Sequence, residues 1–216
     1  MKKCFTLSEV LITLVIIGVV AAITVPTLFA NYVEEEKKSK IKKGYSTLSN
    51  AMTRVKAFGG SLILDYEIND DVQTVTKWFD EYLKPQLITT KICYNTPGCW
   101  SSNGVKYLNG STANGGNVGI GYPTVAAVLN DGMFISVDRD TVSGFGINSS
   151  NQYGLILYFD INGDKKPNVV GKDIFITVYT EEGFVPAYND STKAEVKSEC
   201  SSSRLGRSCI MKYLKQ

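Results

Sequence analysis

The sequence contains no histidine among its 216 residues. This absence excludes Ser-His and Cys-His catalysis and removes the commonest zinc ligand, so most hydrolase mechanisms would need a less usual base. The sequence also has no strong excess of positive or negative charge, because 23 Lys and Arg residues are nearly balanced by 21 Asp and Glu residues, which gives a net charge of +2. The densest charge cluster, from Glu34 to Lys43, places acids before bases at helical spacing, as on a solvated helix face. We therefore expect neither a catalyst nor a nucleic-acid partner.

Charged residues are absent from Val10 to Val33. An uncharged stretch of this length can span a hydrocarbon core of about 30 Å as a helix. A cleaved secretory signal would explain the basic Lys2 and Lys3, but its apolar part is shorter and its cleavage site better than "LFA". A simple signal anchor explains the length but not Glu9, an acid at the cytoplasmic edge of the run. A lipoprotein signal is excluded, because its cysteine follows the apolar stretch.

The segment FTLSEVLITLVIIGVVAAITVP, from Phe5 to Pro26, resembles the amino terminus of type IV pilins and of the pseudopilins of type II secretion. The shared features are a short basic leader, Phe followed by Thr and Leu, the acid Glu9, a long apolar helix and a late proline. In that family a prepilin peptidase cuts on the cytoplasmic side of the apolar segment and methylates the new amino group. The resemblance implies cleavage between Cys4 and Phe5 and N-methylation of Phe5. The family normally has Gly before the cut, where this sequence has Cys4, another small residue.

Glu9 and Pro26 fit this resemblance on physical grounds. A carboxylate at the edge of a bilayer helix costs a few kcal/mol unless it is paired or reaches the interface. In a filament, the amino terminus of a neighbour's Phe5 would pair with Glu9, as the resemblance implies. The alternative is that Glu9 is a solvated residue favoured by the helix dipole. Pro26 should kink the helix, because it lacks an N–H and its ring clashes with the preceding turn.

The resemblance also implies a location and partners. We expect a single-pass protein of the bacterial inner membrane, with its globular domain outside the cytoplasm, that later enters a pilus or pseudopilus. Its partners would be copies of itself, other pilin-like subunits, the prepilin peptidase and an inner-membrane assembly platform. The expected parts are a leader at 1–4, a transmembrane and polymerisation helix at 5–33, and a soluble pilin-like domain at 34–216.

The remaining pattern predicts an α+β fold. Apolar residues recur at helical spacing from Tyr32 to Val55, and "FGG" after Ala57 is a good helix stop, so one helix of about 80 Å is expected. A second helix is predicted over Asn69–Leu83, and 101–121 reads as irregular loop. From Thr124 the pattern becomes that of strands, with a hairpin at Asn130-Asp131-Gly132 and up to five strands in an antiparallel meander. Packed against the amphipathic second half of the long helix, this sheet gives an α+β domain, which is also the architecture that the resemblance to pilins implies.

The chain has five cysteines. An odd number in an exported protein is unusual, and removing Cys4 with the leader makes it even. The short spacings favour the local disulfides Cys93–Cys99 and Cys200–Cys209, which would place the domain outside the cytoplasm. Free cysteines are the alternative, and a zinc site is disfavoured because neither pair has C-x2-4-C spacing.

One loop offers oxygen ligands at alternating positions, in the manner of a calcium site. The candidate ligands are Asp160, Asn162, Asp164, Asn168 and Asp173. Against this, Lys165 and Gly171 stand where a calcium loop has Gly and Glu. A turn between strands, built on Asn162-Gly163 and Pro167, is the interpretation that we favour. We expect no cofactor unless this loop binds calcium.

Taken together, the sequence predicts a structural subunit of a pilus or pseudopilus, assembled through its amino-terminal helix. It would be the substrate of processing enzymes and not an enzyme itself. The alternative is a signal-anchored extracellular enzyme or binding module.

Overall fold

A computed structural model of the chain describes residues 6–60, 72–100, 104–113, 124–147, 153–180 and 182–214. A long helix, α1 (Leu7–Ala57), comes first, and a six-stranded antiparallel sheet follows it, which is the expected α+β arrangement. Within the described residues, further helical segments are α2 (Val72–Trp78), the π-helix η2 (Phe79–Leu83), the 3-10 helices η3 (Lys84–Gln86) and η5 (Val142–Phe145), α3 (Lys193–Glu199) and α4 (Met211–Leu214). The strands are β1 (Thr89–Tyr94), β2 (Thr124–Leu129), β3 (Phe134–Thr141), β4 (Tyr153–Asp160), β5 (Ile174–Tyr179) and β6 (Phe184–Pro186).

The chain divides into two compact units, Met1–Ser39 and Lys40–Gln216. Helix α1 contributes to both, and its first buried side chain is that of Ile41. Helical periodicity placed Tyr32 on the apolar stripe that packs on the domain, but Tyr32 is 66% exposed. The helical pattern continues through both units, whereas burial begins only where the helix reaches the sheet.

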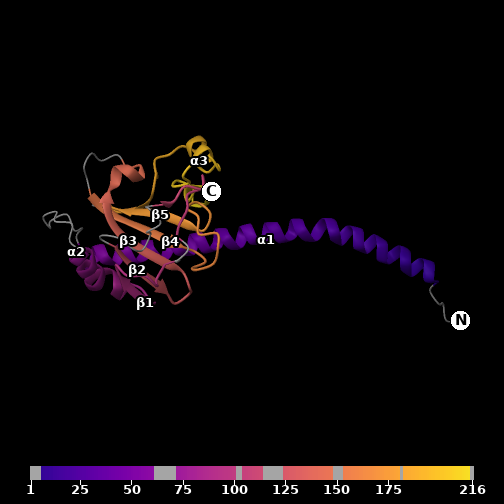
Figure 1. Ribbon diagram of the computed structural model, residues 1–216, viewed down its shortest axis with the longest axis horizontal. Coiled ribbons are helices and arrows are strands. Elements are labelled where there is room, and N and C mark those ends of the chain that lie inside the picture. The colour runs from indigo at the N-terminus through magenta and orange to yellow at the C-terminus, as the bar shows by residue number, and fades with distance from the viewer. Residues whose placement is uncertain are drawn as a thin grey trace. The chain divides into compact units, whose positions relative to one another are not determined.

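The sheet is a meander in which each strand pairs with the next, in the order β1-β2-β3-β4-β5-β6. The hairpin predicted at Asn130-Asp131-Gly132 joins β2 to β3, and Gly132 supplies the positive φ (84°) that the turn needs. Figure 1 shows β1 to β5 side by side. Strand β1 was not predicted. It is an edge strand with one buried residue, Cys93, so its sequence lacks the alternation of a half-buried strand.

Helix α1 packs on one face of this sheet through its last turns. The buried helix residues Leu48, Met52 and Val55 share a core with Leu157 and Phe159 of β4. Gly44 allows a close approach of the helix to the sheet, because a Cβ atom there would lie 2.8 Å from the Phe159 ring. This contact fixes the packing of the helix end against the centre of the sheet.

The opposite face of the sheet is also covered. Alternate residues of β4 and β5, such as Ile156 and Ile176, pack in a second core with Val105, Tyr107 and Phe145. Part of the segment predicted as irregular loop, 104–113, is therefore a cover for the sheet, held by bridges from Lys106 to Thr112 and Val169. Strand β5 is buried along its whole length, which explains its continuous apolar sequence.

The predicted second helix is present in part. Helix α2 continues as η2, and the predicted core positions Val75, Phe79 and Leu83 are fully buried. Residues 69–71 of the prediction lie outside the described residues. The wider π turn was not predicted, because apolar periodicity does not distinguish it from an α-turn.

Candidate functional site

The first half of α1 presents an apolar surface. Its large side chains are exposed, from 43% for Val10 to 78% for Leu7. Leaving one such side chain in water costs about 1.5 to 3 kcal/mol, whereas a whole domain is stable by only about 5 to 15 kcal/mol. The surface is therefore stable only when lipid or protein covers it. Within the described residues, α1 is the one helix long and apolar enough to cross a membrane.

Three threonine hydroxyls inside this apolar segment bond to the backbone of the helix itself. The hydroxyls of Thr13 and Thr24 donate to the carbonyls of Val10 and Val20, both at 2.9 Å. A third hydroxyl, that of Thr27, donates to the Thr24 carbonyl at 2.8 Å. These bonds hide the hydroxyls from an apolar environment, as threonines do in membrane helices. The helix continues through Pro26, and the kink predicted there stays a prediction.

Glu9 lies at the start of the helix and caps it together with Thr6. The Thr6 backbone N–H and hydroxyl both donate to Glu9 Oε2 at 2.8 Å. The Glu9 N–H donates in return to the Thr6 hydroxyl at 3.3 Å. This reciprocal pair is a capping box, whose signal in the sequence, T-L-S-E, was not used in the prediction. Both bonds that the Glu9 carboxylate accepts from Thr6 are made to the same oxygen, Oε2.

Two other predicted sites of the amino terminus, Cys4 and Phe5, lie outside the described residues. Cleavage between them and methylation of Phe5 stay predictions.

Two disulfides, Cys93–Cys99 and Cys200–Cys209, close short loops, with Cα–Cα distances of 5.8 and 5.4 Å. These are the local pairings favoured by the sequence. The first loop is anchored further by Lys91, whose Nζ donates to the Gly98 carbonyl at 2.9 Å. The second links the end of α3 to the segment before α4. Such bonds persist in oxidising compartments.

The candidate calcium loop follows β4 and brings four of its five predicted ligands together. Asp173 Oδ2 accepts from the Asn168 N–H at 2.8 Å and from the Asn162 amide at 3.3 Å. Its other oxygen, Oδ1, accepts from the Val169 N–H at 2.7 Å. Asp160 is fully buried, and its Oδ1 accepts from the Asn162 N–H at 2.9 Å. The fifth residue, Asp164, is exposed.

These contacts describe a turn held by its own carboxylates. The Asn162 side chain directs its amide nitrogen, and not its oxygen, at Asp173, which is the reverse of what a shared cation needs. Burial raises the pKa of Asp160 to about 8, opposed by the Asn162 N–H and increased by the charge of Asp173. In the described part of the chain, no three Cys, Asp or Glu side chains gather to hold a metal ion. Calcium binding by this loop stays a prediction.

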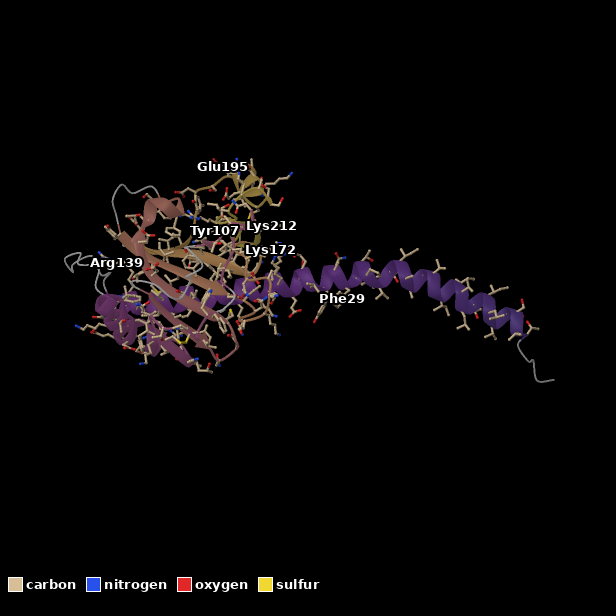
Figure 2. The ribbon with its side chains drawn as sticks, viewed as in Figure 1. Phe29, Tyr107, Arg139, Lys172, Glu195 and Lys212 are labelled. Atoms are coloured by element: carbon tan, nitrogen blue, oxygen red, sulfur yellow. A yellow bond between two sulfur atoms is a disulfide. The ribbon has the colours of Figure 1, made fainter. Side chains whose placement is uncertain are left out.

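Sequence reasoning missed Arg207, which ties the second disulfide loop to the covered face of the sheet. Its guanidinium donates to the Gly144 carbonyl at 3.1 Å and to the Tyr107 hydroxyl at 3.0 Å. It also lies over the rings of Tyr107 and Phe145, 5.1 and 5.7 Å from their centroids. Figure 2 labels Tyr107 in this region. Arg207 thus holds three separate segments together.

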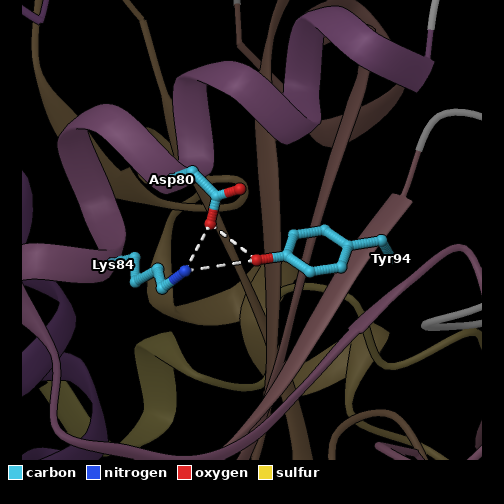
Figure 3. Close-up of polar contacts among 3 residues, drawn as sticks. All are labelled: Asp80, Lys84 and Tyr94. Atoms are coloured by element: carbon cyan, nitrogen blue, oxygen red, sulfur yellow. Dashed lines mark hydrogen bonds and ion pairs between the residues drawn. The ribbon is translucent and has the colours of Figure 1, made fainter.

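A second missed group joins η2 to β1. Tyr94 donates its hydroxyl to Asp80 Oδ1 at 2.6 Å, and Lys84 Nζ lies 2.8 Å from the same oxygen (Figure 3). Burial would raise the pKa of Asp80, but the hydrogen bonds from Lys84 and Tyr94 and the Lys84 charge lower it below its ordinary value. Spacing along a helix could have suggested the Asp80–Lys84 pair, but not Tyr94. The group is partly exposed and positions a helix, so we assign it a structural role.

Comparison with known proteins gives no match: no protein-family model, no curated protein and no solved structure matches this chain. A long apolar amino-terminal helix whose last turns pack on an antiparallel sheet is compatible with a pilin-like fold.

Proposed function

We propose that this protein is a pilin-like structural subunit, made as a membrane-anchored precursor and assembled into a pilus or pseudopilus through α1. The observation that carries the proposal is the exposed apolar surface of α1 with Glu9 at its beginning. A membrane anchor needs the apolar surface but not the acid. A polymer of such helices uses both, because a neighbour's amino terminus neutralises the carboxylate.

The orientation in this proposal follows from charge and redox chemistry. Lys2 and Lys3 precede the apolar run and favour a cytoplasmic amino terminus. The two disulfides belong to the part of the chain after the helix and favour an oxidising compartment. Prepilin peptidase, an inner-membrane assembly platform and other pilin-like subunits are the proposed partners. Whether the filament serves type II secretion or a type IV pilus is decided by neighbouring genes or by visible surface filaments.

The competing proposal is an anchored extracellular enzyme or binding module, which would need a polar cleft containing a perturbed acid. Two acids have strongly raised pKa values through burial, Asp138 to about 7 and Asp160 to about 8. Each accepts a hydrogen bond from a backbone N–H close by, at 2.7 Å from Arg139 for Asp138 and at 2.9 Å from Asn162 for Asp160. Such acids stabilise local turns and strands, so we propose that the chain is a substrate of processing enzymes and no enzyme itself.

Mass spectrometry of the amino terminus tests the proposal, in cells with and without prepilin peptidase. We expect a chain that begins at methylated Phe5 in the first cells and an unprocessed chain in the second. Cys4→Gly restores the usual residue and should be processed at least as completely, whereas Cys4→Leu should block cleavage because the peptidase requires a small residue there. A mature chain with any other start, or cleavage independent of the peptidase, would refute the proposed function.

A further inference from the structure

A groove of about 570 Å³ lies between α3 and α4 in the carboxyl-terminal region. Apolar surface is supplied by Val196 and Met211, both buried, and by Cys200 of the second disulfide. The rim carries three exposed lysines, Lys193, Lys197 and Lys212. Among the described residues that line the groove there is no acid. Its chemistry fits an apolar occupant that carries negative charge.

The sequence of α3 places the lysines toward the groove and the acids away from it. Lys193, Val196, Lys197 and Cys200 follow the spacing i, i+3, i+4 and i+7 of one helix face. Glu195 does not line the groove, because its carboxylate caps the helix by accepting from the Thr192 N–H at 2.6 Å. Because the lysines and the acid of α3 lie on different sides of the helix, the charged residues that line the groove are all positive. Glu195 and Lys212 are labelled in Figure 2.

A matching face occurs on α1 of the same chain. Phe29, Tyr32, Val33 and Glu36 follow the same i, i+3, i+4 and i+7 spacing. The first three are 67%, 66% and 45% exposed, so this face has apolar surface to bury. Glu35 follows Tyr32 at i+3, and its ion pair with Lys38 is long (3.9 Å) and has an exposed carboxylate, so the pair is exchanged at little cost.

We propose that the lysine-rimmed groove of one copy receives the turn Tyr32–Glu36 of a second copy. Tyr32 and Val33 would cover Val196 and Met211, while Glu35 and Glu36 would meet the lysines. This inference rests on the proposed function, because assembly through α1 is what brings this turn of one copy to the domain of another. Lys40 disfavours one alternative register, since a shift of one turn toward the carboxyl end of α1 would place Lys40, in place of Glu36, against the three lysines.

A photo-crosslinker tests this contact in the full-length chain, in membranes of cells that express two differently tagged copies. The crosslinker, p-benzoylphenylalanine, replaces exposed Lys212 on the groove rim in one copy. We expect a covalent dimer of the two tags, with the crosslink mapped by mass spectrometry to the segment 29–36 of the other copy. A crosslink within one chain, to lipid or to a different protein, or no crosslink, overturns the proposal.

Charge reversal gives the matched test. The pair Glu35→Lys with Glu36→Lys, or the pair Lys193→Glu with Lys197→Glu, should lower the crosslinked dimer about fivefold or more. The two pairs combined should restore it. Lys172→Glu with Lys106→Glu makes the same change of net charge as the lysine pair at exposed positions outside the groove, and should have no effect. Equal loss in this control, or no restoration in the combined variant, overturns the contact.

Failure of this inference is separable from failure of the proposed function. A chain that is processed at Phe5 and sediments as filaments without the 29–36 crosslink refutes the groove contact alone. Loss of processing with the crosslink retained refutes the proposed function and leaves the contact between copies.

Discussion

Glu9 has two oxygens, and its capping bonds to Thr6 are made through one of them. The residue can therefore begin its own helix and still receive a positive group from a neighbour. These two roles need different chemistry. Capping needs only an acceptor oxygen, which Gln also supplies, whereas pairing with an amino terminus needs the negative charge.

Substitutions at this pair separate the two roles. Glu9→Gln keeps the cap and removes the charge, and we expect incorporation into filaments to fall on the order of tenfold or more. Thr6→Ala removes the hydroxyl and keeps the charge, so incorporation should stay close to that of the unchanged protein. The measurement is the fraction of processed chain in sheared or sedimented filaments, normalised to the amount in the membrane. Comparable losses in both variants would mean that Glu9 acts only as a cap.

The bonds of Arg207 belong to the element scale, because they attach the disulfide loop to the sheet. Arg207→Lys loses the planar fork and the ring contacts, and should lower the free energy of unfolding by about 1 to 3 kcal/mol. Urea unfolding of the full chain in detergent, followed by fluorescence of the buried Trp78 and Trp100, measures this change. Arg204→Lys, at an exposed position in the same loop, is the control and should have little effect. If both variants lower the free energy of unfolding equally, the loss does not come from the bonds of Arg207 but from any change in this loop.

The loop after β4 makes stability depend on pH. Because the pKa of Asp160 is raised to about 8 in the folded protein, the folded state holds this proton more tightly than the unfolded state, in which the pKa is about 3.9. Its contribution to stability is complete below about pH 4 and is lost as pH rises through about 8, by up to about 1.4 kcal/mol per pH unit. Asp160→Asn keeps an acceptor oxygen and should remove this dependence. Thermal midpoints of both proteins from pH 5 to 9 measure it, and parallel curves would contradict the assignment.

Calcium is tested on the same loop. We expect no rise of the midpoint when calcium replaces chelator, because backbone N–H groups already bond the carboxylates of Asp160 and Asp173. A rise that Asp160→Asn abolishes would show instead that the loop binds the ion.

At the scale of the whole molecule, α1 has two glycines in different surroundings. A Cβ atom at Gly44 would lie 2.8 Å from the Phe159 ring and 3.1 Å from Met133 Sδ, whereas one at Gly18 would meet nothing within 4 Å. Gly44→Val should therefore destabilise the domain by about 1 to 3 kcal/mol through overpacking. Gly18→Val is the matched control and should leave the unfolding midpoint of the domain unchanged. Equal destabilisation by both variants would show that Gly44 is not packed more tightly against the domain than Gly18.

Much of this fold follows from local sequence patterns. The ends of α1, the β2–β3 hairpin and the two disulfide pairs depend on spacings within a few residues, and all were predicted. The edge strand β1 was missed because it is buried on one side at a single residue. The bonds of Arg207 could not be predicted, since they join residues 63 and 100 positions apart. For the candidate site, Glu9 was found from its place in the apolar run, whereas the groove between α3 and α4 depends on tertiary packing.

The meander has two outer strands, and neither offers a long open edge. Strand β6 has three residues and ends at Pro186, which has no N–H to donate. Strand β1 has an irregular register between Thr89 and Lys91, and the Cys93–Cys99 loop closes at its end. Short, irregular edges discourage strand pairing between molecules. Copies of this protein that are brought close together are therefore expected to stay separate, and not to aggregate through their sheets.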